Sequence, residues 1–146
     1  MTGFAKGLII SLVLLVVVIA AGVAAGIYWL STHSGEFLEK SKQSMLEGQR
    51  FGKTTDNQGC LTEAISRHKQ NPGFGGALST QLFLQGCLPA SHETPGFCDE
   101  VPTRTEFLRS AQWQQQQCAR NNLRDSYCPQ MFSQVQVFCE RRRTSE

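Results

Sequence analysis

The stretch LIISLVLLVVVIAAGVAAGIYWL, Leu8 to Leu30, decides the fold because it can adopt only one regular structure in a lipid bilayer. It is apolar except for Ser11, and no Asp, Glu, Lys or Arg occurs between Gly7 and Gly35. A helix of this length measures roughly 34 Å, enough to cross a hydrocarbon core of about 30 Å. Backbone amides in lipid must pair within their own segment, so the stretch predicts a transmembrane helix over residues 7–30.

A cleaved signal peptide is the alternative interpretation of this segment. Lys6 supplies a short basic region, and the small residues 23–25 could form a cleavage site. Against this, the apolar run continues to Leu30, and Tyr28 and Trp29 close it where amphipathic rings favour the headgroup layer. We therefore favour an uncleaved anchor, a signal-anchor, in contact with the lipid bilayer.

The flanking charges do not orient this helix, because basic residues both precede and follow it. Lys6 lies before it, whereas Lys40, Lys42 and Arg50 lie after it. The cysteines suggest the orientation, because all six lie beyond the helix and their even number is typical of three disulfides in an oxidising compartment. The sequence thus predicts a cytoplasmic N-terminus and an extracytoplasmic C-terminal part. The six are Cys60, Cys87, Cys98, Cys118, Cys128 and Cys139.

The part beyond the anchor is poor in core-forming residues. Leu, Ile, Val and Phe make up 21 of the 116 residues from 31 to 146, near the range in which chains stay disordered. Three disulfides would compensate by restricting the unfolded chain, typically by about 2–4 kcal/mol each. With 13 Lys and Arg against 12 Asp and Glu, this part carries a net charge of +1, which argues against a nucleic-acid-binding surface.

Breakers divide the extracytoplasmic part into helices, so we expect an all-α fold. Asn71-Pro72-Gly73 and the turn at residues 122–125 each separate two helices, and Thr103 with Glu106 fits a capping box. The helices are expected at 60–70, 76–88, about 103–121 and about 125–142, arranged as two hairpins. The predicted segments are a cytoplasmic terminus (1–6), the transmembrane helix (7–30), a juxtamembrane segment (31–58), the disulfide-stabilised helical domain (59–143) and a tail (144–146). The juxtamembrane segment is expected to begin as a helix and to end in a Gly-rich linker, residues 48–59, that leads into the domain.

Helix geometry selects among the 15 possible pairings of six cysteines. Cys128 and Cys139 lie on one helix about 16 Å apart, too far for a disulfide, whose Cα atoms lie within about 7 Å. In an antiparallel hairpin, partners lie at equal distances from the turn. Cys60 and Cys87 satisfy this for the first hairpin and Cys118 and Cys128 for the second, which leaves the remaining two to pair. The predicted disulfides are Cys60–Cys87, Cys118–Cys128 and Cys98–Cys139.

No pattern in the sequence predicts catalysis, a metal or a cofactor. There is no C-x-x-C or C-x-x-C-H, and the three histidines lack ligand spacing. Residues 47–54 (EGQRFGKT) match the phosphate-binding motif G-x-x-x-x-G-K-[ST] except at its first glycine. Glu47 stands at that position, and its carboxylate would repel phosphate. The adjacent carboxylates of Asp99 and Glu100 have no recognisable partner base or nucleophile. We therefore expect a protein that is not an enzyme.

Gly22 and Gly26 form a GxxxG pattern within the anchor, which allows close helix–helix contact. This favours self-association or binding of a membrane-protein partner. The leading hypothesis is thus a single-pass, non-enzymatic interaction or accessory protein. A ligand-binding module is the alternative, and a thiol–disulfide factor is a weaker one. Because no N-x-[ST] acceptor occurs, we expect a prokaryotic inner membrane with a periplasmic domain.

Overall fold

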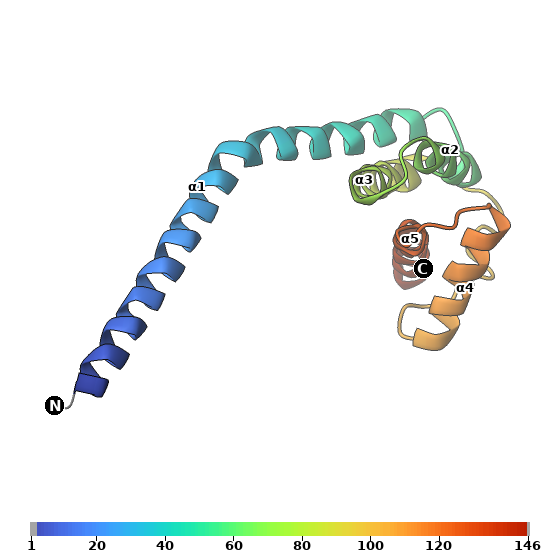
Figure 1. Cartoon of the computed structure of the whole chain (residues 1–146). Coiled ribbons are helices and arrows are strands. Elements are labelled where there is room, and N and C mark those ends of the chain that lie inside the picture. Colours follow the sequence, from blue (N-terminus) through green and yellow to red (C-terminus); the bar gives the residue numbers. More distant parts are fainter. Residues whose placement is uncertain (1–2, 146) are drawn as a thin grey trace. The chain divides into compact units, whose positions relative to one another are not determined.

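A computed structural model describes residues 3–145, and over that range the chain forms five α-helices and no β-strand (Figure 1). The all-α prediction is therefore confirmed. The only strand-like feature in the described part is an isolated bridge between Asp56 and His92. The helices are α1 (Gly3–Gly52), α2 (Asn57–Gln70), α3 (Phe74–Ala90), α4 (Phe107–Arg120) and α5 (Cys128–Ser145).

The chain divides into two compact units, residues 1–39 and 40–146. The first unit contains the apolar part of α1, and its segment Ile9–Thr32 has a mean hydropathy of 2.9. No residue of that segment is buried by the protein: Ile9 is 49% and Tyr28 73% exposed. By length and composition, this segment can cross a membrane, as the sequence predicts.

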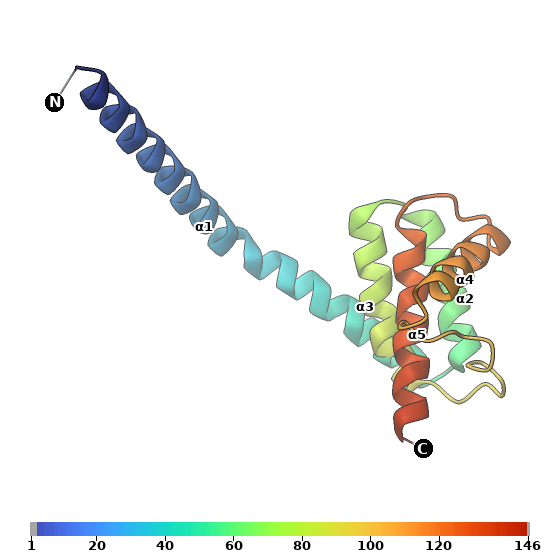
Figure 2. The same ribbon diagram turned by 90° about the horizontal axis from the view of Figure 1, so that it is seen from below.

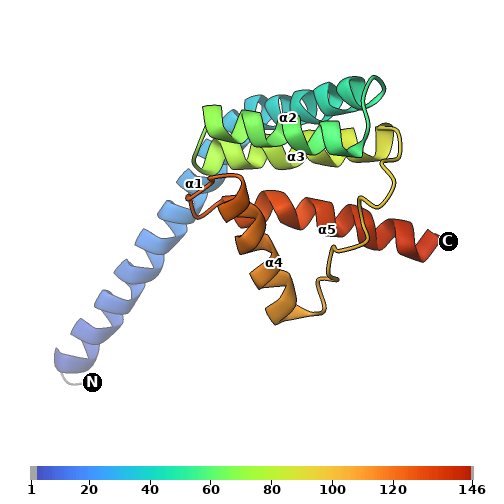
Figure 3. The ribbon, with the colours of Figure 1, turned by 90° about the vertical axis from the view of Figure 1, so that its right-hand side faces the viewer.

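The second unit is a helical domain in which α3 is central. The antiparallel pair α2 and α3 forms one layer, and α5 packs along the other side of α3 (Figures 2 and 3). α4 contacts α5 and crosses it steeply (Figure 3). The core lies where α3 meets α5, and its largest fully buried side chains include Phe83, Leu84, Met131 and Phe132.

The predicted linker at residues 48–59 is wrong in its first part, because α1 continues to Gly52. Its glycines instead allow close helix packing against α3. A Cβ on Gly48 would collide with the Phe83 carbonyl oxygen, one on Gly52 with the Cys87 carbonyl oxygen, and one on Gly86 with the Met45 carbonyl oxygen. Glycine weakens a helix by up to about 1 kcal/mol, but here it removes the Cβ atoms that would hold two backbones apart.

Hydrogen bonds at the start of α2 fix it to the segment after α3. The Asp56 side chain caps the helix by accepting a hydrogen bond from the Gly59 N–H. Asn57, which is 1% exposed, donates from Nδ2 to Ser91 Oγ and accepts at Oδ1 from the Thr94 N–H. Buried amide groups need such partners, so these bonds set where the loop after α3 begins.

Several helix boundaries differ from the predicted ones. α2 begins at Asn57, inside the predicted linker, α3 begins at Phe74 instead of residue 76, and α5 begins at Cys128 instead of about residue 125. α4 begins at Phe107, because the Thr103–Glu106 pair closes a turn ahead of the helix: Glu106 Oε2 accepts from the Thr103 N–H, but the Thr103 hydroxyl donates to Glu106 rather than capping the backbone. α3 includes Pro89 in its last turn and ends at Ala90. α5 extends to Ser145, three residues beyond the predicted end near Arg142.

Candidate functional site

The six cysteines form three disulfides, Cys60–Cys87, Cys98–Cys139 and Cys118–Cys128, with Cα–Cα distances of 5.8, 5.4 and 6.0 Å. These are the pairs that the hairpin geometry predicts. Cys60–Cys87 joins α2 to α3, and Cys118–Cys128 joins the end of α4 to the start of α5. Cys98–Cys139 fastens the long loop before α4 onto α5, so each element after α1 is covalently tied to a neighbour.

No group of three or more His, Cys, Asp or Glu side chains suited to a metal ion occurs among the described residues. The segment that resembled a phosphate-binding loop is the last turn of α1 and the bend after it, and its Gly48 and Gly52 face α3. Two of the C-terminal arginines have structural partners: Arg142 pairs with Glu93 at 2.6 Å, and Arg143 donates to the Val101 carbonyl oxygen at 2.8 Å. Gly22 and Gly26 have open space around them, and their role in association stays a prediction.

His68 and Asp125 form a partly buried pair that the sequence analysis missed. His68 is fully buried, and its Nε2 lies 2.8 Å from Asp125 Oδ2, which joins the end of α2 to the turn between α4 and α5. Its Nδ1 is the one buried side-chain nitrogen or oxygen without a hydrogen-bond partner in the described chain. A signal was present, because Cys60, Ala64 and His68 recur every four residues on the buried face of α2.

This pair predicts a loss of stability in acid. Partial burial raises the pKa of Asp125, but hydrogen bonds from His68 and from the Tyr127 N–H lower it by more, so the pKa lies below its ordinary value of 3.8. A carboxylate with a lowered folded pKa stabilises the protein above its unfolded pKa, and this contribution is lost as the pH falls through the folded pKa. At pH 7 we expect Asp125→Asn to lower the free energy of unfolding by about 1–2 kcal/mol.

At pH 2 the difference between wild type and Asp125→Asn should shrink to a few tenths of a kcal/mol, because the wild-type carboxyl is then protonated as well. Chemical denaturation followed by near-UV circular dichroism at both pH values measures the difference. If Asp125→Asn lowered the free energy of unfolding equally at pH 7 and pH 2, the charge of Asp125 would not be what stabilises the domain.

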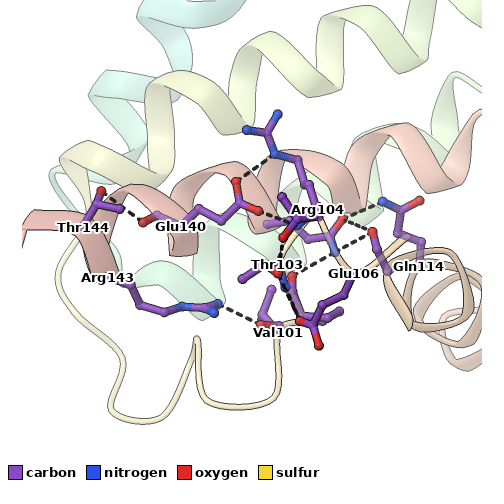
Figure 4. A network of polar contacts seen from close by, with 12 residues as sticks. Val101, Thr103, Arg104, Glu106, Gln114, Glu140, Arg143 and Thr144 are labelled. Carbon is purple, nitrogen blue, oxygen red and sulfur yellow. Dashed lines mark hydrogen bonds and ion pairs between the residues drawn. The ribbon is translucent and has the colours of Figure 1, made fainter. Parts of the chain in front are cut away.

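Polar contacts hold α4 against α5 and thereby fix the orientation of its opposite side (Figure 4). Gln136 of α5, which is fully buried, donates from Nε2 to the Pro102 carbonyl oxygen and accepts at Oε1 from Ser110 and Gln114 of α4. Ahead of the helix, Arg104 binds the Glu140 carboxylate through both its backbone N–H and its guanidinium. The glutamine run of α4 is therefore divided, since Gln114 belongs to this inner network whereas Gln115 and Gln116 are exposed.

The side of α4 that faces away from α5 is rich in uncharged residues, and Arg109, which pairs with Glu106 at 3.0 Å, and Arg120 border it. We define the α4 outer face as Phe107, Leu108, Ala111, Gln112, Gln115, Gln116 and Ala119, which recur at helical spacing and are all exposed. Phe107 and Leu108 are 81% and 82% exposed, more than any other large apolar residue whose side chain the structure describes. Scattered exposed apolar residues are common, but two large adjacent ones with a polar rim are typical of a contact surface.

A second feature is an open cleft of about 300 Å³ between α2, the loop before α4, and the α4–α5 pair. We call it the aromatic cleft, because Phe97, Trp113 and Phe132 line it. Trp113 meets Phe132 edge-on, with ring centroids 5.9 Å apart. The polar side chains that line it include Gln58, Gln117 and Glu100. Trp113 is partly buried, and the cleft forms only because four separate segments meet.

The comparisons with known proteins do not add a relative. The sequence matches no family model, and neither the curated proteins nor the solved structures compared with it give a significant match.

Proposed function

We propose that this chain is a single-pass, membrane-anchored accessory protein that is not an enzyme and whose extracytoplasmic helical domain binds a membrane-protein partner. The observation that carries this proposal is the α4 outer face, an exposed helix surface that begins with two large, almost fully exposed apolar side chains. The apolar segment Ile9–Thr32 supports the anchor, since its side chains have no cover within the protein.

The disulfides support an extracytoplasmic position for the domain. Such bonds persist in oxidising compartments, and a domain with so few aliphatic residues depends on them. Five of the six cysteines are buried, and only Cys98 is partly accessible. Exchange requires access of a thiolate to a disulfide sulfur, so this burial favours structural bonds over a thiol–disulfide activity. We place the N-terminus in the cytoplasm and the domain in the periplasm of a prokaryotic cell.

The chemistry of the α4 outer face indicates the kind of partner. Phe107 and Leu108 can enter an apolar pocket, the glutamines can form hydrogen bonds around it, and the bordering Arg109 and Arg120 can meet acidic side chains at its rim. An anchored domain meets other proteins of the same membrane at high effective concentration. Gly22 and Gly26 would add a contact between the membrane helices of the two proteins.

Replacing Phe107 and Leu108 together by serine is expected to lower the recovery of the membrane-protein partner about tenfold or more, because anchor residues of this size dominate binding energy. The full chain would be purified from membranes in a mild detergent, and the partner quantified by mass spectrometry. The folded domain should keep its melting temperature, since both side chains are exposed.

Phe74→Ser is the matched control, because Phe74 is also a large exposed apolar residue, 64% exposed, but lies on α3, where its ring meets Tyr127. It should leave partner recovery unchanged. A wild-type protein that purifies as a monomer without a partner would refute the proposed function. Equal recovery with the double variant would show that the α4 outer face is not the contact.

A further inference from the structure

The lining of the aromatic cleft has one charged residue, Glu100, and no Lys or Arg. Glu100 is exposed, and within the described chain no Lys, Arg or His nitrogen lies within 4.0 Å of its carboxylate. The other two carboxylates of the loop segment 91–102 lie elsewhere, since Glu93 pairs with Arg142 and Asp99 lines a different hollow, so Glu100 supplies the charge of the cleft. The cleft therefore attracts a cation and repels an anion.

The walls of the cleft suit a cation that is carried on an apolar stem. The rings of Phe97, Trp113 and Phe132 line it, and an aromatic face attracts guanidinium or ammonium groups while its apolar surface packs against methylene groups. Within the described chain, no hydrogen bond involves the indole N–H of Trp113, which leaves this donor for a bound group. A volume of about 300 Å³ is at the small end for ligand pockets, so one long side chain is a better match than a larger ligand.

Two further lining residues indicate that the stem belongs to a polypeptide. Gln58 of α2 and Gln117 of α4 come from the two helices that flank the cleft, and each amide can both donate to and accept from a peptide backbone. We propose that the aromatic cleft binds an arginine or lysine side chain of a polypeptide, with the cation at Glu100 and the stem against Trp113. This proposal does not depend on the α4 outer face, which lies on the other side of the same helix.

The test uses the full chain in a polyoxyethylene detergent, with Trp29→Phe so that Trp113 is the only tryptophan. The probe is acetyl-Ala-Arg-Ala-amide, and its uncharged counterpart carries citrulline in place of arginine. The arginine peptide should change the Trp113 emission saturably and bind at least about threefold more tightly than the citrulline peptide, as expected for one exposed ion pair. Raising the salt concentration should weaken the binding of the arginine peptide and leave the binding of the citrulline peptide unchanged.

Glu100→Gln should abolish the preference for arginine over citrulline. Asp99→Asn is the matched control: it removes the neighbouring carboxylate, which lines a different hollow with Arg142 and Arg143, and it should keep the preference. Equal binding of the two peptides, or no saturable change with either, would overturn the proposal. So would tighter binding of free agmatine than of the arginine peptide, or binding of N-acetylglucosamine alone, because the occupant would then be a small cation or a neutral sugar. Phe107→Ser with Leu108→Ser should leave peptide binding intact, which separates this test from that of the proposed function.

Discussion

Replacing Gly86 by alanine is expected to lower the free energy of unfolding of the helical domain by about 2–3 kcal/mol, the upper range for overpacking. The added Cβ would collide with the carbonyl oxygen of Met45 in α1, and its next neighbour is the Gln49 backbone nitrogen. Both are backbone atoms within helices, so neither can rotate away as a side chain would. The two helices would have to separate along the contact that Gly48 and Gly52 also form.

Gly75→Ala is the matched control, since it makes the same change in the same helix. A Cβ at Gly75 would have nothing within 4 Å, so the variant should be unchanged or more stable by up to about 1 kcal/mol. Thermal melting of the full chain in detergent, followed by near-UV circular dichroism, should place Gly86→Ala about 8 °C or more below wild type. Equal melting temperatures for Gly86→Ala and Gly75→Ala would show that α1 and α3 are not packed closely here.

Reducing all three disulfides is expected to unfold the domain. By restricting the unfolded chain, the bonds that span 27 and 41 residues each stabilise the domain by about 3.5–4 kcal/mol. The bond that spans 10 residues stabilises it by somewhat less, about 2.7 kcal/mol. Together these approach the whole stability of a typical domain, about 5–15 kcal/mol. The core of this domain is small, so little would remain to hold the helices together.

The measurement is the near-UV signal and the melting transition of the full chain before and after treatment with a reducing agent. Helical far-UV signal from the apolar part of α1 should persist, because that segment contains no cysteine. Among variants that replace one pair by alanine, loss of Cys98–Cys139 should cost the most stability and loss of Cys118–Cys128 the least. A reduced chain that still melts cooperatively at the original temperature would contradict the proposed dependence on disulfides.

Several features of the domain could be predicted because their signals are local. The breaker at residues 71–73 ends α2, and an apolar stripe that includes Met131, Phe132 and Val135 becomes the buried face of α5. Cys60–Cys87 follows from the turn between the antiparallel α2 and α3, Cys118 and Cys128 lie on either side of the next turn, and Cys98–Cys139 follows by elimination. Each of these inferences needs only helix geometry and the spacing of residues along the chain.

The packing of the α1 glycines against α3 could not be predicted in this way. Turn formers are typical of linkers, and nothing near Gly48 or Gly52 in the sequence shows that Gly86, more than thirty residues later, lies against them. The same holds for His68 with Asp125 and for the aromatic cleft, whose lining residues come from four segments. The sequence alone was enough for the apolar segment, the all-α class and the disulfides, because hydrophobicity, breakers and spacing act locally. Only the tertiary structure decided the glycine contact, the α4 outer face and the cleft, because each depends on backbones and side chains that meet after distant segments have packed.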